Sequence, residues 1–238
     1  MVLTFVLSNI VNAQTKKVSH ENQQWIQYYN ETKLNKTWTL LTDASFRWKE
    51  AFNENSQFLV RTGLGYSIAP NLRIGGGFTY VGFYSQDTLN KIEYRPHQDL
   101  VFKSTYNKIK ISQRVRIEER FFNPLNNPNH SFNFRFRYSF NVSVPIAKLS
   151  KSNPDCIFLL NIGDEIFINT GKETPTQTFD QNRFIISPTF QLNKRLSISP
   201  TFNSQFASTT TARSYKQTNV FWLQVRHNLD LNKNNKTK

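Results

Sequence analysis

The feature that most constrains this chain is a strict alternation of apolar and polar side chains between residues 132 and 146. Successive side chains of a β-strand point to opposite faces, so a period of two predicts a strand with one apolar and one polar face. The even positions are all apolar and the odd positions include Asn, Arg and Ser: Phe132, Phe134, Phe136, Tyr138, Phe140, Val142, Val144 and Ile146 against Asn133, Arg135, Arg137, Ser139, Asn141 and Ser143. Such a strand separates two very different solvents.

The same alternation returns along most of the chain. We expect strands at 38–48, 58–68, 72–84, 97–107, 109–122, 132–146, 155–169, 181–191, 195–206 and 219–231, and a shorter one near Trp25–Tyr29. Single-chain bacterial barrels have even strand numbers. We therefore expect ten strands if the first segment is partial, or twelve if one strand is missed, which gives a range of about 10–12.

The connections between these strands differ in length. Short connections are expected at 69–71, 107–108 and 192–194, and long polar ones at 85–96, 123–131, 170–180 and 207–218, with an intermediate one at 147–154. Outer-membrane barrels have short turns at one end and long loops at the other. We therefore expect the four long loops to share one end.

Overall hydrophobicity does not contradict a membrane location. The mean hydropathy is −0.54 and no run of about 18 apolar residues exists, so no transmembrane helix is expected. In a barrel only alternate residues face lipid. The sequence predicts an all-β, antiparallel up-and-down transmembrane β-barrel, whose amphipathic aromatic side chains lie on the outer wall or near its rims: Trp38, Trp48, Tyr66, Tyr80 and Tyr138.

The ends of the chain have a different composition. Residues 1–14 form a short apolar run that ends in small and polar residues, typical of a secretory signal peptide cleaved near Ala13, although no basic region precedes it. A buried first strand is the alternative. We expect the barrel to occupy 24–231, the Lys- and Asn-rich tail 232–238 to be disordered, and the protein to reside in the cell outer membrane of a Gram-negative cell. The single cysteine, Cys156, excludes an internal disulfide.

Four motifs in order resemble an uncharacterised protein family. They are Arg-Val-Arg-Ile-Glu-Glu-Arg-Phe at 114–121, Phe-Arg-Phe-Arg-Tyr at 134–138, Asp-Glu-Ile-Phe-Ile-Asn at 164–169 and Phe-Asp-Gln-Asn-Arg-Phe at 179–184. The family is the one catalogued as domain of unknown function 2490, which is assigned to outer-membrane barrels. The resemblance covers roughly residues 24–231 and implies a barrel and an outer-membrane location. It implies no activity, substrate or catalytic residue.

The polar faces of several strands carry charges that would line the barrel interior. We expect a lumen charge network of arginines and a few carboxylates: Arg114, Arg116, Glu118, Arg120, Arg135, Arg137, Glu165 and Arg183. Approximate hairpin registers place Glu165 opposite Arg183 and bring Glu118 and Glu165 to either side of Arg135 and Arg137. The network forms either an anion-favouring passage or a structural set of ion pairs that fills a narrow barrel. We favour the structural interpretation, because long arginine side chains can largely occupy a lumen of this size.

No motif indicates catalysis, a metal or a cofactor. The four histidines lack a suitably placed nucleophile and orienting group, and we expect them on the surface. No Cys/His cluster has metal-ligand spacing, and the glycines at 75–77 lie inside a strand pattern, where glycine marks a bulge, a bend or close packing. The net charge of +14 is spread along the chain, so nucleic acid is not expected as a partner.

The sequence therefore favours a non-enzymatic outer-membrane barrel that is structural or forms a narrow solute path. Its expected partners are outer-membrane lipids and, during insertion, the barrel-assembly machinery. Two alternatives remain open: an outer-membrane lipid-modifying enzyme and a secreted soluble β-barrel binding protein. The direction in which the apolar faces point distinguishes the soluble alternative, because alternation alone does not tell inside from outside.

Overall fold

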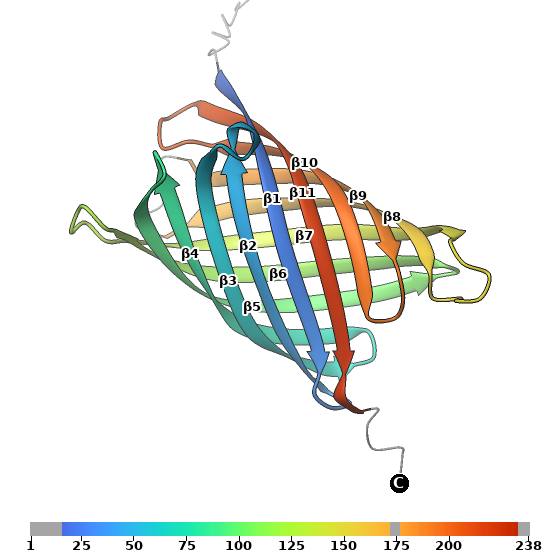
Figure 1. Ribbon diagram of the computed structural model, residues 1–238. Helices are drawn as coiled ribbons and strands as arrows, with labels where there is room; N and C mark the ends of the chain where they lie inside the picture. The colour runs from blue at the N-terminus through green and yellow to red at the C-terminus, as the bar shows by residue number, and fades with distance from the viewer. Residues whose placement is uncertain (1–15, 172–176, 233–238) are drawn as a thin grey trace, which may run out of the picture.

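The computed structural model describes residues 16–171 and 177–232, which form one closed β-barrel (Figure 1). The strands follow the positions expected from the alternation and are mostly longer. A 3-10 turn, η1 (Glu50–Phe52), lies between β2 and β3. The strands are β1 (Lys17–Lys33), β2 (Trp38–Lys49), β3 (Glu54–Ala69), β4 (Leu72–Ser85), β5 (Thr88–Tyr106), β6 (Ile109–Pro124), β7 (Ser131–Lys148), β8 (Ile157–Thr170), β9 (Phe179–Gln191), β10 (Leu196–Ser208) and β11 (Ser214–Asp230).

Consecutive strands pair antiparallel, and the barrel is closed by a parallel pair between β1 and β11. In this seam Trp25 lies in register with Trp222, and Figure 1 shows the blue first strand beside the red last strand. The up-and-down barrel is confirmed, and its eleven strands fall within the expected range. The expectation of an even number was wrong, because the segment near Trp25 is the middle of a full 17-residue strand. An odd number makes the first and last strands run in the same direction, so they can only pair parallel.

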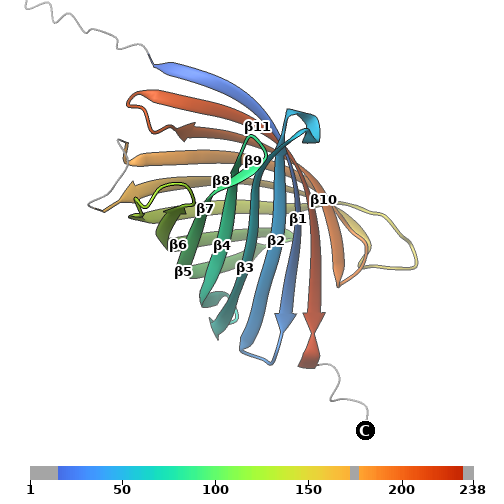
Figure 2. The same cartoon turned by 60° about the vertical axis from the view of Figure 1, so that its left-hand side comes forward.

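The two ends of the barrel are distinct (Figure 2). We call the end that holds the links 34–37, 70–71, 107–108, 149–156 and 192–195 the turn end, and the opposite end, with links 50–53, 86–87, 125–130, 171–178 and 209–213, the loop end. The four connections expected to share an end do so, because strand direction alternates. β1 starts at the loop end and β11 finishes at the turn end.

The expected difference in loop length is only partly present. Residues 88–96 belong to β5, and a two-residue turn at Gln86 and Asp87, with φ of 50° and 58°, replaces the long loop expected at 85–96. In the sequence this segment resembles a loop because it is rich in charged residues. In the structure two of them, Glu93 and Arg95, are buried on the lumen face. At the turn end, the link 149–156 is longer than the links 50–53, 86–87, 125–130 and 209–213 at the opposite end.

The apolar face of the alternation points outward. Among the described residues, 24 polar or charged residues are buried against seven apolar ones, and large apolar side chains cover the outside. On β7 the even positions Phe136 and Phe140 are 42% and 40% exposed. The five aromatic residues expected on the outer wall lie on that face, and Trp38, Tyr66 and Tyr138 are exposed there. The packed interior of this protein is therefore its charged lumen.

The expected boundaries fall at the edges of what the structure describes. The signal peptide expected at 1–14 lies outside the described residues, as does the tail beyond residue 232. The first strand begins at Lys17, ahead of the barrel start expected at residue 24. In the part of the chain that the structure describes, no helix is long and apolar enough to cross a membrane.

Candidate functional site

The eight residues of the expected lumen charge network all lie on the lumen face. β6 supplies four of them at every second position, β7 two, and β8 and β9 one each. Their side chains are buried or half-buried, since this face encloses the barrel interior. Seven of the eight take part in ion pairs: Arg114, Arg116, Glu118, Arg120, Arg135, Arg137 and Glu165.

The centre of the network is a chain of charges across three strands. Glu118 on β6 forms ion pairs with both arginines of β7. Its Oε2 lies 2.5 Å from Arg135 Nη2 and its Oε1 lies 2.5 Å from Arg137 Nη1. Arg137 also reaches Glu165 on β8, with 2.8 Å between Nη2 and Oε1. The same oxygen of Glu165 accepts a hydrogen bond from Arg114 Nη2 at 2.7 Å. The two carboxylates thus lie on either side of Arg137.

Arg183 lies opposite Glu165 in the β8–β9 ladder, but its guanidinium takes another direction. Its Nε donates to Gln205 Oε1 at 2.9 Å. The guanidinium carbon lies 4.8 Å from the ring centroid of Phe167 and 5.4 Å from that of Trp25. Arg137 and Arg114 both hydrogen-bond to Glu165. Arg183 is stabilised instead by stacking on the two aromatic rings and by the amide of Gln205.

Two aromatic side chains point into the lumen among these charges. Phe167 is 0% exposed and Trp25 is 2% exposed. Arg135 and Arg137 lie over the Phe167 ring at 5.2 and 4.3 Å, and Arg47 lies over Trp25 at 3.9 Å. These side chains form what we call the central layer, which consists of Trp25, Arg47, Glu118, Arg135, Arg137, Phe167 and Arg183.

Several charges extend the network beyond the expected eight. Asp43 pairs with Arg61 at 2.5 Å and Asp99 with Arg116 at 2.5 Å. These residues occupy polar positions of their strands, so parity alone could have placed them on the lumen face. The other additions are Glu93, which holds Arg95 and Arg120, and Asp180, which pairs with Arg135 at 2.9 Å. Glu93 and Arg95 lie where a loop was expected, and Asp180 lies at a bulge in β9 that the sequence does not reveal.

The histidines are not all on the surface. His97 on β5 is 5% exposed inside the lumen, which corrects the expectation for this residue. Its position is an odd one on a strand whose odd positions face inward. On the outer wall, His227 Nδ1 lies 3.0 Å from the hydroxyl of Tyr28 rather than from a serine. Within the described ranges, no three His, Cys, Asp or Glu side chains are grouped so that they could hold a metal ion.

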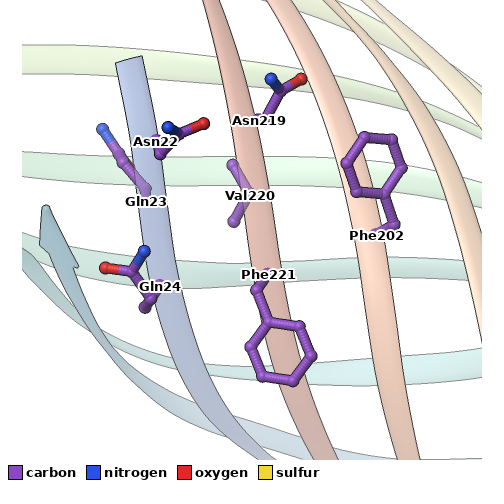
Figure 3. A pocket seen from close by; sticks show the side chains of 7 residues that line it. All are labelled: Asn22, Gln23, Gln24, Phe202, Asn219, Val220 and Phe221. Carbon is purple, nitrogen blue, oxygen red and sulfur yellow. The ribbon is translucent and has the colours of Figure 1, made fainter. Parts of the chain in front are cut away.

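A few polar side chains interrupt the outer wall, and they hydrogen-bond one another across strands. Asn182 donates to Asp164 Oδ1 at 2.7 Å, and Tyr138 donates to Gln113 at 2.8 Å. A shallow hollow of about 360 Å³ lies at the parallel seam, where the polar residues of β1 lie beside the aromatic rings of β10 and β11 (Figure 3). It is lined by Asn22, Gln23, Gln24, Phe202, Asn219, Val220 and Phe221.

A closed barrel with an apolar outer wall and an ion-paired, aromatic-filled lumen is the class of protein that this geometry defines. The chain belongs to the family described as Protein of unknown function (DUF2490), whose model matches residues 22–216. No curated protein matches it. Among solved structures it is similar to the siderophore receptor PirA from Pseudomonas aeruginosa, at 12% identity and a TM-score of 0.35, over 74% of this chain. The match covers 33% of that receptor, so the chain spans about a third of its length.

Proposed function

We propose that this chain is a non-enzymatic outer-membrane β-barrel whose lumen is closed by its own side chains. The observation that carries the proposal is the inversion of the two faces, with charges inside and large apolar side chains outside. A water-soluble barrel buries its apolar face, because apolar area exposed to water costs about 25 cal/mol per Å². The inverted arrangement is favourable only where lipid contacts the outer wall.

The polar side chains on the outer wall are compatible with this environment. In lipid an unsatisfied polar group costs several kcal/mol, so such groups are tolerated when they pair. Asp164 with Asn182, Gln113 with Tyr138 and Tyr28 with His227 are paired in this way. The wall therefore needs no water to satisfy these groups.

The central layer supports a structural role rather than an open pore. Two unit charges about 4 Å apart attract by roughly 4 kcal/mol at an effective dielectric of 20, before the cost of desolvation is subtracted. Arg137 makes two such contacts and also covers Phe167. A layer connected in this way stiffens the barrel and blocks diffusion along its axis.

Outer-membrane lipids are the proposed partners of the wall, and the barrel-assembly machinery is the proposed partner during insertion. A lipid-modifying enzyme would need an outer-wall nucleophile activated by a base. His227, the outer-wall histidine of the seam, hydrogen-bonds a tyrosine instead. This tyrosine contact gives His227 a structural partner, which is in line with the proposed non-enzymatic role.

Two measurements on the purified full chain test the proposal. First, the folded protein should need detergent or lipid to remain monodisperse, and it should fractionate with outer membranes. Second, planar bilayers containing it should show no stable conductance. A protein that is monodisperse in buffer without detergent would be the soluble alternative, and steady ohmic conductance would show an open path through the lumen.

A further inference from the structure

Several buried polar atoms without a hydrogen-bond partner lie together on one part of the lumen wall. They are four nitrogens, Nε and Nη1 of Arg116, Nε of Arg114 and Nδ1 of His97, and one carboxylate oxygen, Oδ1 of Asp99. The Arg116 residue is only 5% exposed. Leaving such a group unsatisfied costs about 1–3 kcal/mol, and more when it is charged. The four nitrogens in one place therefore indicate a site that accepts a ligand with hydrogen-bond acceptors.

The strand ladder brings these residues together. Asp99 on β5 lies in register with Arg116 on β6, which in turn lies in register with Arg137 on β7. The charges of Arg114, Arg61 and Arg137 all act on Arg116. Arg114 and Arg137 both donate to Oε1 of Glu165, so these two guanidinium groups share one carboxylate oxygen.

A wall of glycines lies next to this cluster. Gly63 pairs with Gly77, and Gly65 with Gly75, on the lumen face of β3 and β4. A Cβ on Gly75 would lie 2.8 Å from Asp99 Oδ1. Asp99 therefore rests against the backbone with this oxygen turned to the wall, while its Oδ2 holds Arg116.

The cluster is closed on one side and open on the other. Along β6, Arg116 precedes Glu118, whose residue is 1% exposed within the central layer. Arg114, one step nearer the turn end, has 27% of its side chain exposed. Exposed basic residues surround this end of the barrel, where they would raise the local concentration of anions: Lys33, Lys36, Lys108, Lys148, Lys151, Lys194 and Arg195.

We infer that His97, Arg114 and Arg116 form a binding site for an oxyanion, the phosphate or carboxylate group of a small solute. The solute enters from the turn end and stops at the central layer. Guanidinium groups suit this ligand because their planar N–H donors match the oxygen spacing of carboxylates and phosphates. His97 donates from Nδ1 when that nitrogen carries the proton. Asp99 is a positioning residue that holds Nη2 of Arg116 and leaves Nε and Nη1 free to bind.

Isothermal titration of the detergent-solubilised full chain tests this site with two probes, inorganic phosphate and acetate, at constant ionic strength set by chloride. We expect saturable binding of at least one probe. Comparing the affinities for phosphate and acetate shows which oxyanion the site prefers. The double variant D99N/R116Q leaves net charge unchanged and removes the charged donors of Arg116, so binding should weaken at least tenfold. The variant R116K keeps a positive charge that can pair with Asp99 but loses the guanidinium donors Nε and Nη1, so it should also weaken binding. It provides the test if the double variant fails to fold.

The control is K49Q/E54Q, which removes a charge-neutral pair near the loop end, where Lys49 Nζ lies 3.3 Å from Glu54. It should bind the probes as the unaltered protein does. No saturable binding of either probe, or binding that survives both substitutions at Arg116, overturns the inference. This result is independent of the proposed function, because titration in detergent tests neither membrane location nor conductance.

Discussion

Arg137 and Glu165 form an ion pair across β7 and β8, with 2.8 Å between Nη2 and Oε1, although Glu165 lies in register with Ser139. The arginine therefore reaches diagonally, by one step along its face of the sheet, to meet the carboxylate. Both side chains are nearly inaccessible, at 8% and 7%. A buried pair of this kind couples neighbouring strands through the lumen as well as through their backbone hydrogen bonds.

Removing the carboxylate of Glu165 should be costly. The variant E165Q leaves Arg137 and Arg114 without the charge of the oxygen they share, and we expect the free energy of unfolding to fall by about 3–5 kcal/mol. Urea unfolding in lipid vesicles measures this. D155N is the matched control, because Asp155 pairs at the rim with Lys194, which is 71% exposed; its effect should stay below about 1 kcal/mol. Equal effects of the two variants would contradict a structural network.

Opening the central layer should create a path through the barrel. The variant W25A/F167A removes the two aromatic side chains that the arginines cover, and we expect conductance where the unaltered protein shows none. F136A is the control, because Phe136 points outward and its loss leaves the lumen unchanged. Single-channel recording in planar bilayers distinguishes the two. A silent double variant that is folded would mean that other side chains close the lumen.

A charge on the outer wall should reveal the surrounding medium. F136R places a guanidinium at a 42% exposed position in the apolar wall. In a membrane the substitution should lower the free energy of unfolding by about 2–4 kcal/mol, whereas in a water-soluble barrel it should be nearly neutral. Unfolding in vesicles, compared with F136L, measures the difference. A neutral outcome for F136R would argue against lipid contact at this site.

The glycine wall offers a matched pair of substitutions. A Cβ on Gly77 would lie 2.4 Å from the carbonyl oxygen of Thr62, but one on Gly76 would meet nothing nearer than 3.6 Å. G77A should therefore destabilise the barrel by about 1–3 kcal/mol through overpacking, and G76A should change stability little. Chemical unfolding of both variants tests the close approach of β3 and β4. Equal stabilities of G77A and G76A would show that the two strands are not packed this closely.

The parallel seam can be tested by cross-linking in a C156S background. Ile26 lies in register with Leu223, so I26C/L223C should form a disulfide on mild oxidation. In I26C/H227C the second position is four residues further along β11, about 13 Å away, and should not cross-link. Gel mobility under reducing and oxidising conditions reads out the result. Efficient cross-linking of the second pair alone would require a different closure of the barrel.

The strands and their two faces could be predicted from the sequence because period-two alternation is a local property. It placed all eight charges of the expected network, including Glu165 and Arg183, on the same face. The outward direction of Phe136 and Phe140 also follows from it, once lipid is taken as the outer solvent.

The number of strands, the partners of each charge and the closed lumen were decided only by the tertiary structure. Closure depends on β1 and β11, which are about 200 residues apart, and the polar outer positions Asn22 and Gln24 hide the alternation in β1. Arg137 covers its ladder neighbour Phe167 and pairs with Glu165 one step away, because a long flexible side chain selects its charged partner by distance across the lumen. Trp25 and Phe167 fill the interior because barrel curvature brings β1 and β8 to face each other, and no local pattern records that meeting.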